Sequence, residues 1–580
     1  MKASSATPSS PPKPPAFIWG VLTAIALLLC LRLQLYPVLS FLEPHTAPPV
    51  QACPQVDSLV PKINEAIWEG TLQATASDSF KARAVDWLAG AIRIPTEAFD
   101  NMEAVGVDPR WNVFGDLHAY LAEAFPLVYA NFKVRTVNTY GLWYEWTGSD
   151  TSLKPMLLMA HQDVVPVEPS TVSQWTHPPF SGYFDGHRIW GRGSSDDKNG
   201  LIGILSALEV LLENSFTPTR TLILAFGFDE EVTGLEGAAQ LAKALLDTYG
   251  GNSFALVVDE GGGVIEQFGV AAAFLGVAEK GYLDVVVQVT APGGHSSIPP
   301  DHTSIGILAA MLVQIEDTPH PVQLTRESTP YHTFQCLAAY GQTMTPAVKR
   351  LIEDSASSDA ALHALEATLS KNPLYKAQIQ TTTAIDVIRG GVKANALPEQ
   401  VQALINHRIL SESSVAAVHA YDAALLQPLA ERFNLTFKAF GSEMSEPLLS
   451  ASGALTMEGL YPLEPAPVSP THGAEAEAFR LLSGSIRATF DSRRGAAAGG
   501  ESVVVVPASG TGNTDTQFYW SLSPHIFRYG HSGSAHVRGE DDDILNGIHT
   551  VDEYIDADDF VEIIRFYLTL ILNVDESKVV

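Results

Sequence analysis

The sequence has few cysteines and few basic residues, and each shortage excludes a class of protein. Three cysteines in 580 residues are too few for a disulfide scaffold and lack the paired spacing of a structural zinc site. They leave open at most one bridge, between Cys53 and Cys336. Lys and Arg total 35 against 65 Asp and Glu, and the net charge of −30 repels phosphate backbones. We therefore expect no nucleic-acid partner.

Apolar residues are abundant. They make up 46% of the chain, which excludes disorder as its global state. A chain of 580 residues is also too long for one ordinary domain, so two packed units are expected.

The N-terminal region carries a long apolar run. Residues 16–36 contain one charge, Arg32, and are close to the ~20 residues that a bilayer requires. Lys2 and Lys13 precede the run and favour a cytosolic N-terminus, which predicts a transmembrane signal anchor with the rest of the chain lumenal. The alternative is a cleaved signal peptide. A sequon at Asn434–Thr436 agrees with the secretory route.

Beyond the N-terminal region, short apolar runs alternate with helical patterns. The runs 156–160, 221–226 and 254–258 have the length of buried strands, and 198–212 and 237–246 have helical spacing. This alternation predicts an α/β fold with a mostly parallel central sheet flanked by helices. In such sheets the ligand site lies at the carboxyl ends of the strands.

A second unit is expected to begin near Tyr282. Residues 283–290 have the pattern of a strand and precede the turn 291–294, and mixed strand and helix patterns continue to about Phe440. A Gly/Ala-rich patch at 495–500 is typical of a surface loop.

Polar residues follow each predicted strand. Separately, His161-Gln162-Asp163 is typical of a polar loop, and the acids in the glycine turn before Lys198 are typical of helix capping. Together the strand ends and turns supply one histidine and many carboxylates to one rim, where acids without a cation would repel each other. Histidine with carboxylates suits zinc, and a bridging carboxylate allows two ions. The carboxylates are Asp163, Asp196, Asp197, Asp229, Glu230, Glu231, Asp259 and Glu260.

From about residue 80 to the C-terminus, these motifs resemble the dinuclear zinc peptidases that include glutamate carboxypeptidase, aminoacylase and fungal vacuolar carboxypeptidase S. The resemblance implies two zinc ions per chain. His161 and Asp259 would bind one ion, Glu231 and a late histidine the other, and Asp196 would bridge them. It also implies a cis peptide bond between Asp196 and Asp197.

The resemblance implies further roles near the zinc ions. Asp163 would orient His161, and Glu230 would be the general base. The late histidine has four candidates. His549 is favoured because the segment 549–553 ends in an Asp-Glu pair as in the family, and His536 is the main alternative. The four candidates are His525, His531, His536 and His549.

The second unit resembles the lid domain of the family. His295, in Gly293-Gly294-His295, would donate to the developing oxyanion. Asn395 and Arg408 would hold the free carboxylate of the substrate, which suits a guanidinium fork. The alternative interpretation is that His295 and Asn395 only occupy turns and that Arg408 is an ordinary surface residue. Many relatives have an acid where this chain has Asn406, which leaves the local lid contacts open.

With this resemblance the chain divides into six regions. We expect a cytosolic tail at 1–15, a transmembrane signal anchor at 16–36, a linker at 37–76, catalytic parts at 77–281 and 443–580, and an inserted smaller α+β lid or dimerisation domain at 282–442. A homodimer through the lid and a vacuolar membrane location with a lumenal catalytic domain are further expectations.

The predicted function is a zinc metallocarboxypeptidase that hydrolyses the C-terminal peptide bond of short peptides. The same site could hydrolyse or condense N-acyl amino acids, since both substrates have a free carboxylate. From another class, a catalytically silent lumenal binding domain is disfavoured because Glu230 is intact. A serine hydrolase is disfavoured because Gly530–Ser534 does not complete the nucleophile-elbow motif.

Overall fold

The computed structural model describes residues 53–445, 450–494, 502–537 and 546–578. The predicted tail at 1–15, signal anchor at 16–36, the start of the linker and the 495–500 patch lie outside these ranges. Among the helices that are described, none combines the length and apolar character needed to cross a bilayer.

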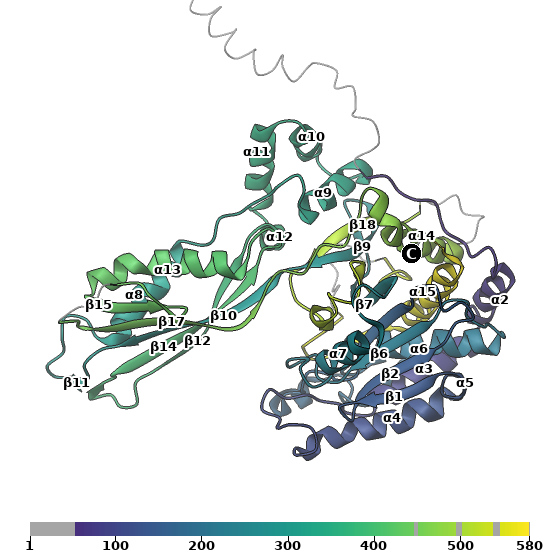
Figure 1. Ribbon diagram of the computed structural model, residues 1–580, viewed down its shortest axis with the longest axis horizontal. Coiled ribbons are helices and arrows are strands. Elements are labelled where there is room, and N and C mark those ends of the chain that lie inside the picture. Colours follow the sequence, from purple (N-terminus) through teal and green to yellow (C-terminus); the bar gives the residue numbers. More distant parts are fainter. Residues whose placement is uncertain (1–52, 446–449, 495–501, 538–545, 579–580) are drawn as a thin grey trace, which may run out of the picture. The chain divides into compact units, whose positions relative to one another are not determined.

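The larger sheet has nine strands in the order β1-β2-β6-β3-β7-β19-β9-β18, with β8 paired to β9 (Figure 1). Neighbours β6, β3, β7 and β19 run parallel, whereas β1, β2 and the β19–β9 pair are antiparallel. The predicted parallel arrangement therefore holds for the centre of a mixed sheet. The strands are β1 (Lys133–Val137), β2 (Gly141–Trp146), β3 (Met156–His161), β6 (Leu222–Gly227), β7 (Leu256–Gly262), β8 (Val264–Gln267), β9 (Val270–Glu279), β18 (Val504–Gly510) and β19 (Ile526–Tyr529).

Helices cover both faces of this sheet. Alternate residues of β3 point to opposite faces: Leu158 and Ala160 pack against one group of helices, and Leu157 and Met159 pack against another. Both faces are buried, which explains the continuous apolar strands. The first face is covered by α3 (Asp78–Ile92), α6 (Lys198–Glu213), α14 (Glu477–Arg494) and α15 (Ala557–Glu576), and the second by α7 (Ala238–Tyr249). Helices α4 (Val113–Ala124) and α5 (Pro126–Asn131) complete this part.

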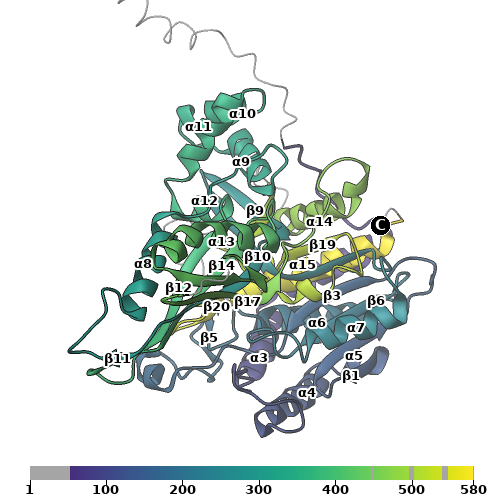
Figure 2. The same cartoon turned by 60° about the vertical axis from the view of Figure 1, so that its left-hand side comes forward.

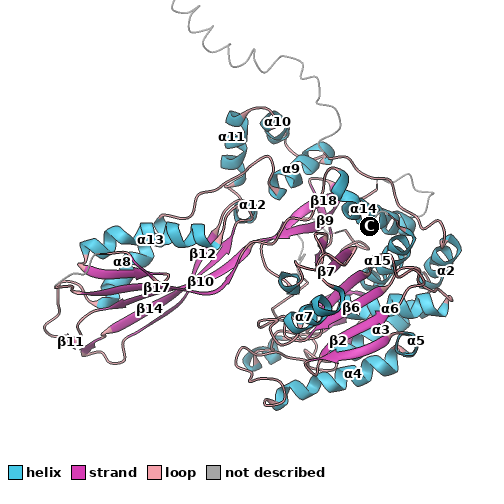
Figure 3. Ribbon diagram, in the orientation of Figure 1, coloured by secondary structure: helices cyan, strands magenta, loops and turns pink. Residues whose placement is uncertain are grey.

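A second sheet has six strands in the order β12-β14-β10-β17-β15-β16 (Figure 3). Its pairs are antiparallel except β15–β17, and α8 and α13 share its core. Its elements are β10 (Gly281–Thr290), β12 (Thr382–Gly390), β14 (Gln400–Ile409), β15 (Leu435–Ala439), β16 (Ser442–Glu443), β17 (Gly453–Leu463), α8 (Ser304–Asp317) and α13 (Val415–Arg432). Two small sheets pair β11 (Gly294–His295) with β13 (Ala396–Leu397), and β20 (Tyr554–Asp556) with β5 (Arg188–Trp190) and β4 (Tyr183–Phe184).

Two predicted boundaries need correction. The expected linker at 37–76 contains helix α2 (Glu65–Thr75), because Trp68 is buried and its Nε1 donates to Thr569 Oγ1 on α15 at 3.0 Å. The second sheet also extends beyond the predicted end at residue 442, since β17 pairs with β10 along most of its length.

A helical insertion interrupts the predicted lid. Helices α9 (Thr329–Tyr340), α10 (Pro346–Ser355), α11 (Asp359–Leu369) and α12 (Pro373–Gln378) share a core with β9 and β18 of the larger sheet (Figures 1 and 2). Cys336 on α9 is disulfide-bonded to Cys53, with a Cα–Cα distance of 4.9 Å. The bridge that the sequence left open is therefore formed.

Candidate metal centre

The polar residues converge because their strands are neighbours. His161 ends β3, and it lies opposite Gly227, the last residue of β6, in the parallel register. The acids 229–231 begin two residues after the end of β6, and Asp259 and Glu260 lie on β7, the other neighbour of β3. The rim predicted from the sequence is thus built from three adjacent parallel strands (Figure 1).

His161 is at the centre of one cluster and is fully buried. Its Nε2 lies 3.1 Å from Asp196 Oδ1 and 3.5 Å from Glu260 Oε1. Its Nδ1 lies 3.0 Å from the Asp163 carbonyl oxygen and 3.3 Å from Asp163 Oδ1, which fits the predicted orienting role. Burial disfavours the charged imidazole, but the surrounding carboxylates, Glu260 first, outweigh it and raise the pKa of His161.

His549 approaches from the C-terminal part of the chain. Its Nε2 lies 3.0 Å from Asp196 Oδ2 and 3.2 Å from Glu231 Oε2, and these carboxylates raise the pKa of His549 to about 10. Asp196 therefore lies between the two histidines and contacts each with a different oxygen, as a bridging carboxylate must. The alternative, His536, groups instead with Asp556 and Asp559.

Asp163 connects the histidine to the acidic segment after β6. Its two carboxylate oxygens accept the backbone N–H groups of Glu230 at 3.2 Å and Glu231 at 3.0 Å. Burial raises the pKa of the Glu230 carboxyl well above its ordinary value. The side chain also interacts electrostatically with His161, Glu231 and Asp196. A buried carboxyl with a raised pKa beside this cluster has the properties of a general acid and base.

The donor set fits divalent cations. Two histidines face a larger number of carboxylates. Burial raises the pKa of Glu231 above its ordinary value and the pKa of Asp259 to about 6. Glu231 Oε1 and Asp259 Oδ2 are buried without a hydrogen-bond partner. Such crowding is costly unless cations neutralise it, and histidine with carboxylate is a zinc-type donor set. The carboxylates are Asp163, Asp196, Asp197, Glu230, Glu231, Asp259 and Glu260.

The third strand end offers two neighbouring acids, the predicted Asp259 and Glu260. Consecutive residues of β7 point in opposite directions, and it is Glu260 that reaches His161. Within the described chain, the potential ligand groups at this rim are His161–Asp196–Glu231 and His161–Asp197–Glu260, and Asp259 belongs to neither. Sequence reasoning placed Asp197 and Glu260 at the rim but gave neither a ligand role, although strand alternation along 256–262 carried the signal for Glu260.

An ion pair joins the two turns that supply Asp196 and His549. Arg192 Nη1 lies 2.7 Å from Glu553 Oε2, and the side chains are 5% and 1% exposed. Glu553 Oε1 accepts Ser195 N–H at 2.9 Å, and Arg192 Nη2 donates to the Thr550 carbonyl at 3.0 Å. The peptide bond between Asp196 and Asp197 is cis, as expected. Sequence reasoning did not identify this pair.

Two predicted lid residues lie together on the second unit. His295, in β11, pairs with Ala396 of β13, and the Asn395 carbonyl accepts the N–H of Ser296 at 3.3 Å. His295 is exposed, and its Nδ1 lies 2.7 Å from Ser297 Oγ. His295 and Asn395 therefore lie close to each other, and contacts within the lid hold them there.

Arg408 on β14 contacts the larger unit. Its Nη1 donates to Asn513 Oδ1 at 3.0 Å, and its guanidinium lies 4.7 Å from the Tyr282 ring centroid. Asn406, where many relatives have an acid, donates to Asp284 Oδ1 at 2.9 Å, so an acid is present at this point on the neighbouring strand β10.

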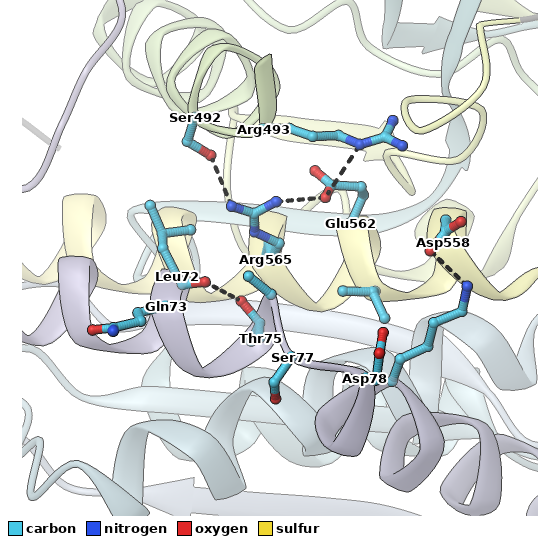
Figure 4. A pocket seen from close by; sticks show the side chains of 13 residues that line it. Leu72, Gln73, Thr75, Ser77, Asp78, Ser492, Arg493, Asp558, Glu562 and Arg565 are labelled. Carbon is cyan, nitrogen blue, oxygen red and sulfur yellow. Dashed lines mark hydrogen bonds and ion pairs between the residues drawn. The ribbon is translucent and has the colours of Figure 1, made fainter. Parts of the chain in front are cut away.

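Figure 4 shows a pocket of about 480 Å³ that is built by other elements. Its lining comes from α2, α3, α14 and α15, and none of the predicted site residues belongs to it. Most of its charged groups form ion pairs, as in Arg565–Glu562 at 2.6 Å and Lys81–Asp558 at 2.8 Å. The candidate chemistry is therefore at the strand ends.

Comparison with known proteins agrees with this architecture. Residues 157–573 match the model of peptidase family M20/M25/M40. Carboxypeptidase S of Saccharomyces cerevisiae is 37% identical, over 92% of this chain and 93% of the relative. The human N-fatty-acyl-amino acid synthase/hydrolase is 31% identical, over 85% of this chain and 88% of the relative.

The fold is also found among solved structures. Human carnosine dipeptidase 1 matches with a TM-score of 0.57 at 14% identity, covering 90% of this chain and 100% of that chain. This family implies a dinuclear metal site, and the clusters around His161 and His549 supply candidate ligands for one. The chain belongs to peptidase family M20/M25/M40 and is a metallocarboxypeptidase of that family.

Proposed function

We propose that this enzyme hydrolyses the C-terminal peptide bond of short peptides at a site that holds two zinc ions. The observation that carries the proposal is the position of Asp196 between His161 and His549, with the buried Glu230 close by. His161 and Glu260 would hold one ion, His549 and Glu231 the other, and Asp196 would contact both. Asp259 remains an alternative to Glu260.

Bound zinc would polarise the scissile carbonyl and lower the pKa of water at the site. Glu230 would take the proton from that water and pass it to the leaving amine. Its burial supports this role, because a raised pKa lets the carboxyl retain the proton between the two transfers. Asp163 would fix both the imidazole of His161 and the backbone of Glu230, since it contacts both.

Selectivity for a free carboxylate would come from the lid. The Arg408 guanidinium can donate two hydrogen bonds to a carboxylate, and Asn395 can add an amide donor. His295 would donate to the oxyanion that develops on the scissile carbonyl. His295 pairs with Ala396, the residue that follows Asn395, and this proximity supports a joint role at the substrate.

A second candidate is the hydrolysis or synthesis of N-acyl amino acids. It is supported by the 31% identity to the human protein with that named activity. Both reactions use the same carboxylate anchor and proton carrier, so they differ only in what the acyl side of the site accepts. A silent binding domain is disfavoured because Glu230 is present beside the complete cluster.

We further propose that the catalytic part is lumenal, anchored by residues 16–36 in the membrane of a vacuole-like compartment. The Cys53–Cys336 disulfide supports an oxidising route. A homodimer through the lid remains part of the proposal, as an expectation from the family resemblance.

The experiment compares three substrates with the purified full chain: N-acylated Gly-Leu, its C-terminal amide, and an N-fatty-acyl leucine. We expect cleavage of the first, and at least a 100-fold lower kcat/KM for the amide, because Arg408 would lose an anionic partner. Equal rates for acid and amide would refute the carboxylate anchor. Faster turnover of the fatty-acyl substrate would favour the second candidate.

A further inference from the structure

A second cluster of metal-type side chains lies in the smaller unit. His320 follows α8, His407 lies on β14 and Asp422 on α13, and all three are buried. His320 Nε2 lies 3.2 Å from Asp422 Oδ1, and His407 Nε2 lies 3.1 Å from Asp422 Oδ2. One potential ligand atom from each residue lies within 4.8 Å of the other two.

These distances match the spacing of ligands around one small cation. Zinc binds nitrogen and oxygen at about 2.0–2.1 Å in a tetrahedron, which places neighbouring ligand atoms about 3.3 Å apart. His320 Nε2 lies at about this distance from Asp422 Oδ1, at 3.2 Å, and His407 Nε2 from Asp422 Oδ2, at 3.1 Å. Three protein ligands leave one position for water.

The hydrogen bonding of the cluster also points to a cation. His320 Nε2 is buried and has no hydrogen-bond partner, although Asp422 Oδ1 is only 3.2 Å away, so the nitrogen is not aligned with the oxygen. The other nitrogen of His407, Nδ1, lies 3.2 Å from Thr383 Oγ1, the outer contact that orients a metal-binding imidazole. Asp422 is 3% exposed, and a carboxylate at that depth requires a positive partner.

We propose that His320, His407 and Asp422 form a third metal site, which holds a Zn²⁺ ion with three protein ligands in the lid. The ion joins three segments that are distant in sequence: the turn after α8, strand β14 and helix α13 (Figure 1). His407 points to the helix-covered face of β14, and its neighbour Arg408 contacts Tyr282 and Asn513 instead. A metal here fixes the strand that carries Arg408.

The first measurement is the zinc content of the purified full chain by elemental analysis. We expect three zinc ions per wild-type chain and two in His407→Gln. The matched control is His419→Gln on the same helix as Asp422: that imidazole stacks on Phe440 at 3.7 Å between centroids and lies outside the group. The control is expected to keep three. Equal zinc content in wild type and both variants would overturn the proposal.

A second variant covers the case in which His407→Gln fails to fold. His407→Cys keeps a zinc-type donor and adds a spectroscopic signature, because cobalt bound to a thiolate gives a near-ultraviolet charge-transfer band. We expect this band in Co²⁺-loaded His407→Cys, and we expect it to be absent from Co²⁺-loaded wild type. No band in the folded variant would overturn the site, and this result is independent of the catalytic ions and of peptide hydrolysis.

Discussion

The buried ion pair between Arg192 and Glu553 gives the sharpest prediction about the metal centre. The pair joins the turn before Asp196 to the segment after His549, and Asp196 and His549 are 3.0 Å apart. Arg192→Ala removes the ion pair and the contact to the Thr550 carbonyl. We expect the change to destabilise the fold and to weaken zinc binding together, since it releases two ligand-bearing segments.

The magnitude follows from the burial of the pair. The Glu553 side chain is only 1% exposed. Removing the partner of such a buried carboxylate lowers the free energy of unfolding by about 3–5 kcal/mol. Loss of a group that positions metal ligands typically lowers metal affinity by about 10- to 100-fold. At about 1.4 kcal/mol per tenfold change, this corresponds to about 1.4–2.8 kcal/mol of binding free energy.

The assay combines urea unfolding of the metal-free protein with zinc titration. The matched control is Arg188→Ala: Arg188 pairs with Asp556 at 3.4 Å on neighbouring strands, but it is 41% exposed, so we expect a cost of at most about 1 kcal/mol. The reasoning would be refuted if both variants lost the same unfolding free energy and bound zinc as tightly as the wild type.

Three further predictions concern a buried lysine, the disulfide bond and the choice of metal ligand on β7. Burial lowers the pKa of Lys280 from 10.5 to about 7, so the unfolded chain binds more protons between these values. The unfolding free energy should therefore rise with pH across this window, by at most about 1.4 kcal/mol per pH unit, and Lys280→Met should flatten the slope in urea titrations. Removing the Cys53–Cys336 bridge by Cys336→Ser should cost about 2–5 kcal/mol in the same assay, and an unchanged midpoint would contradict this. Glu260→Gln should weaken zinc binding more than Asp259→Asn, because Glu260 is the residue that contacts His161; the opposite order would restore Asp259 as the ligand.

Much of the larger unit could be predicted from the sequence because its strands are short apolar runs. The runs at 156–160, 221–226 and 254–258 correspond to three neighbouring parallel strands, so the residues that follow them had to converge. The antiparallel strands β1 and β2 were not predicted. Helix α2 was missed because the preceding proline-rich stretch suggested a tether, and its tertiary contact through Trp68 is not visible in local sequence.

Candidate residues could be named from the sequence where they lie next to a strand end, as for His161, or in the glycine turn before a helix, as for Asp196. The choice between Asp259 and Glu260 depends on the direction of each side chain on β7, which one residue of register reverses. The Arg192–Glu553 pair and the His320–His407–Asp422 group join segments that are distant in sequence, and their proximity depends on the tertiary fold.

The central claim is that Glu230 moves the proton at a metal centre that other residues hold. The most direct measurement is kcat for N-acylated Gly-Leu together with zinc content, for wild type and Glu230→Gln. The account predicts unchanged zinc content and a fall in kcat of about 10²- to 10⁴-fold. A variant that keeps its zinc and retains wild-type kcat would contradict it.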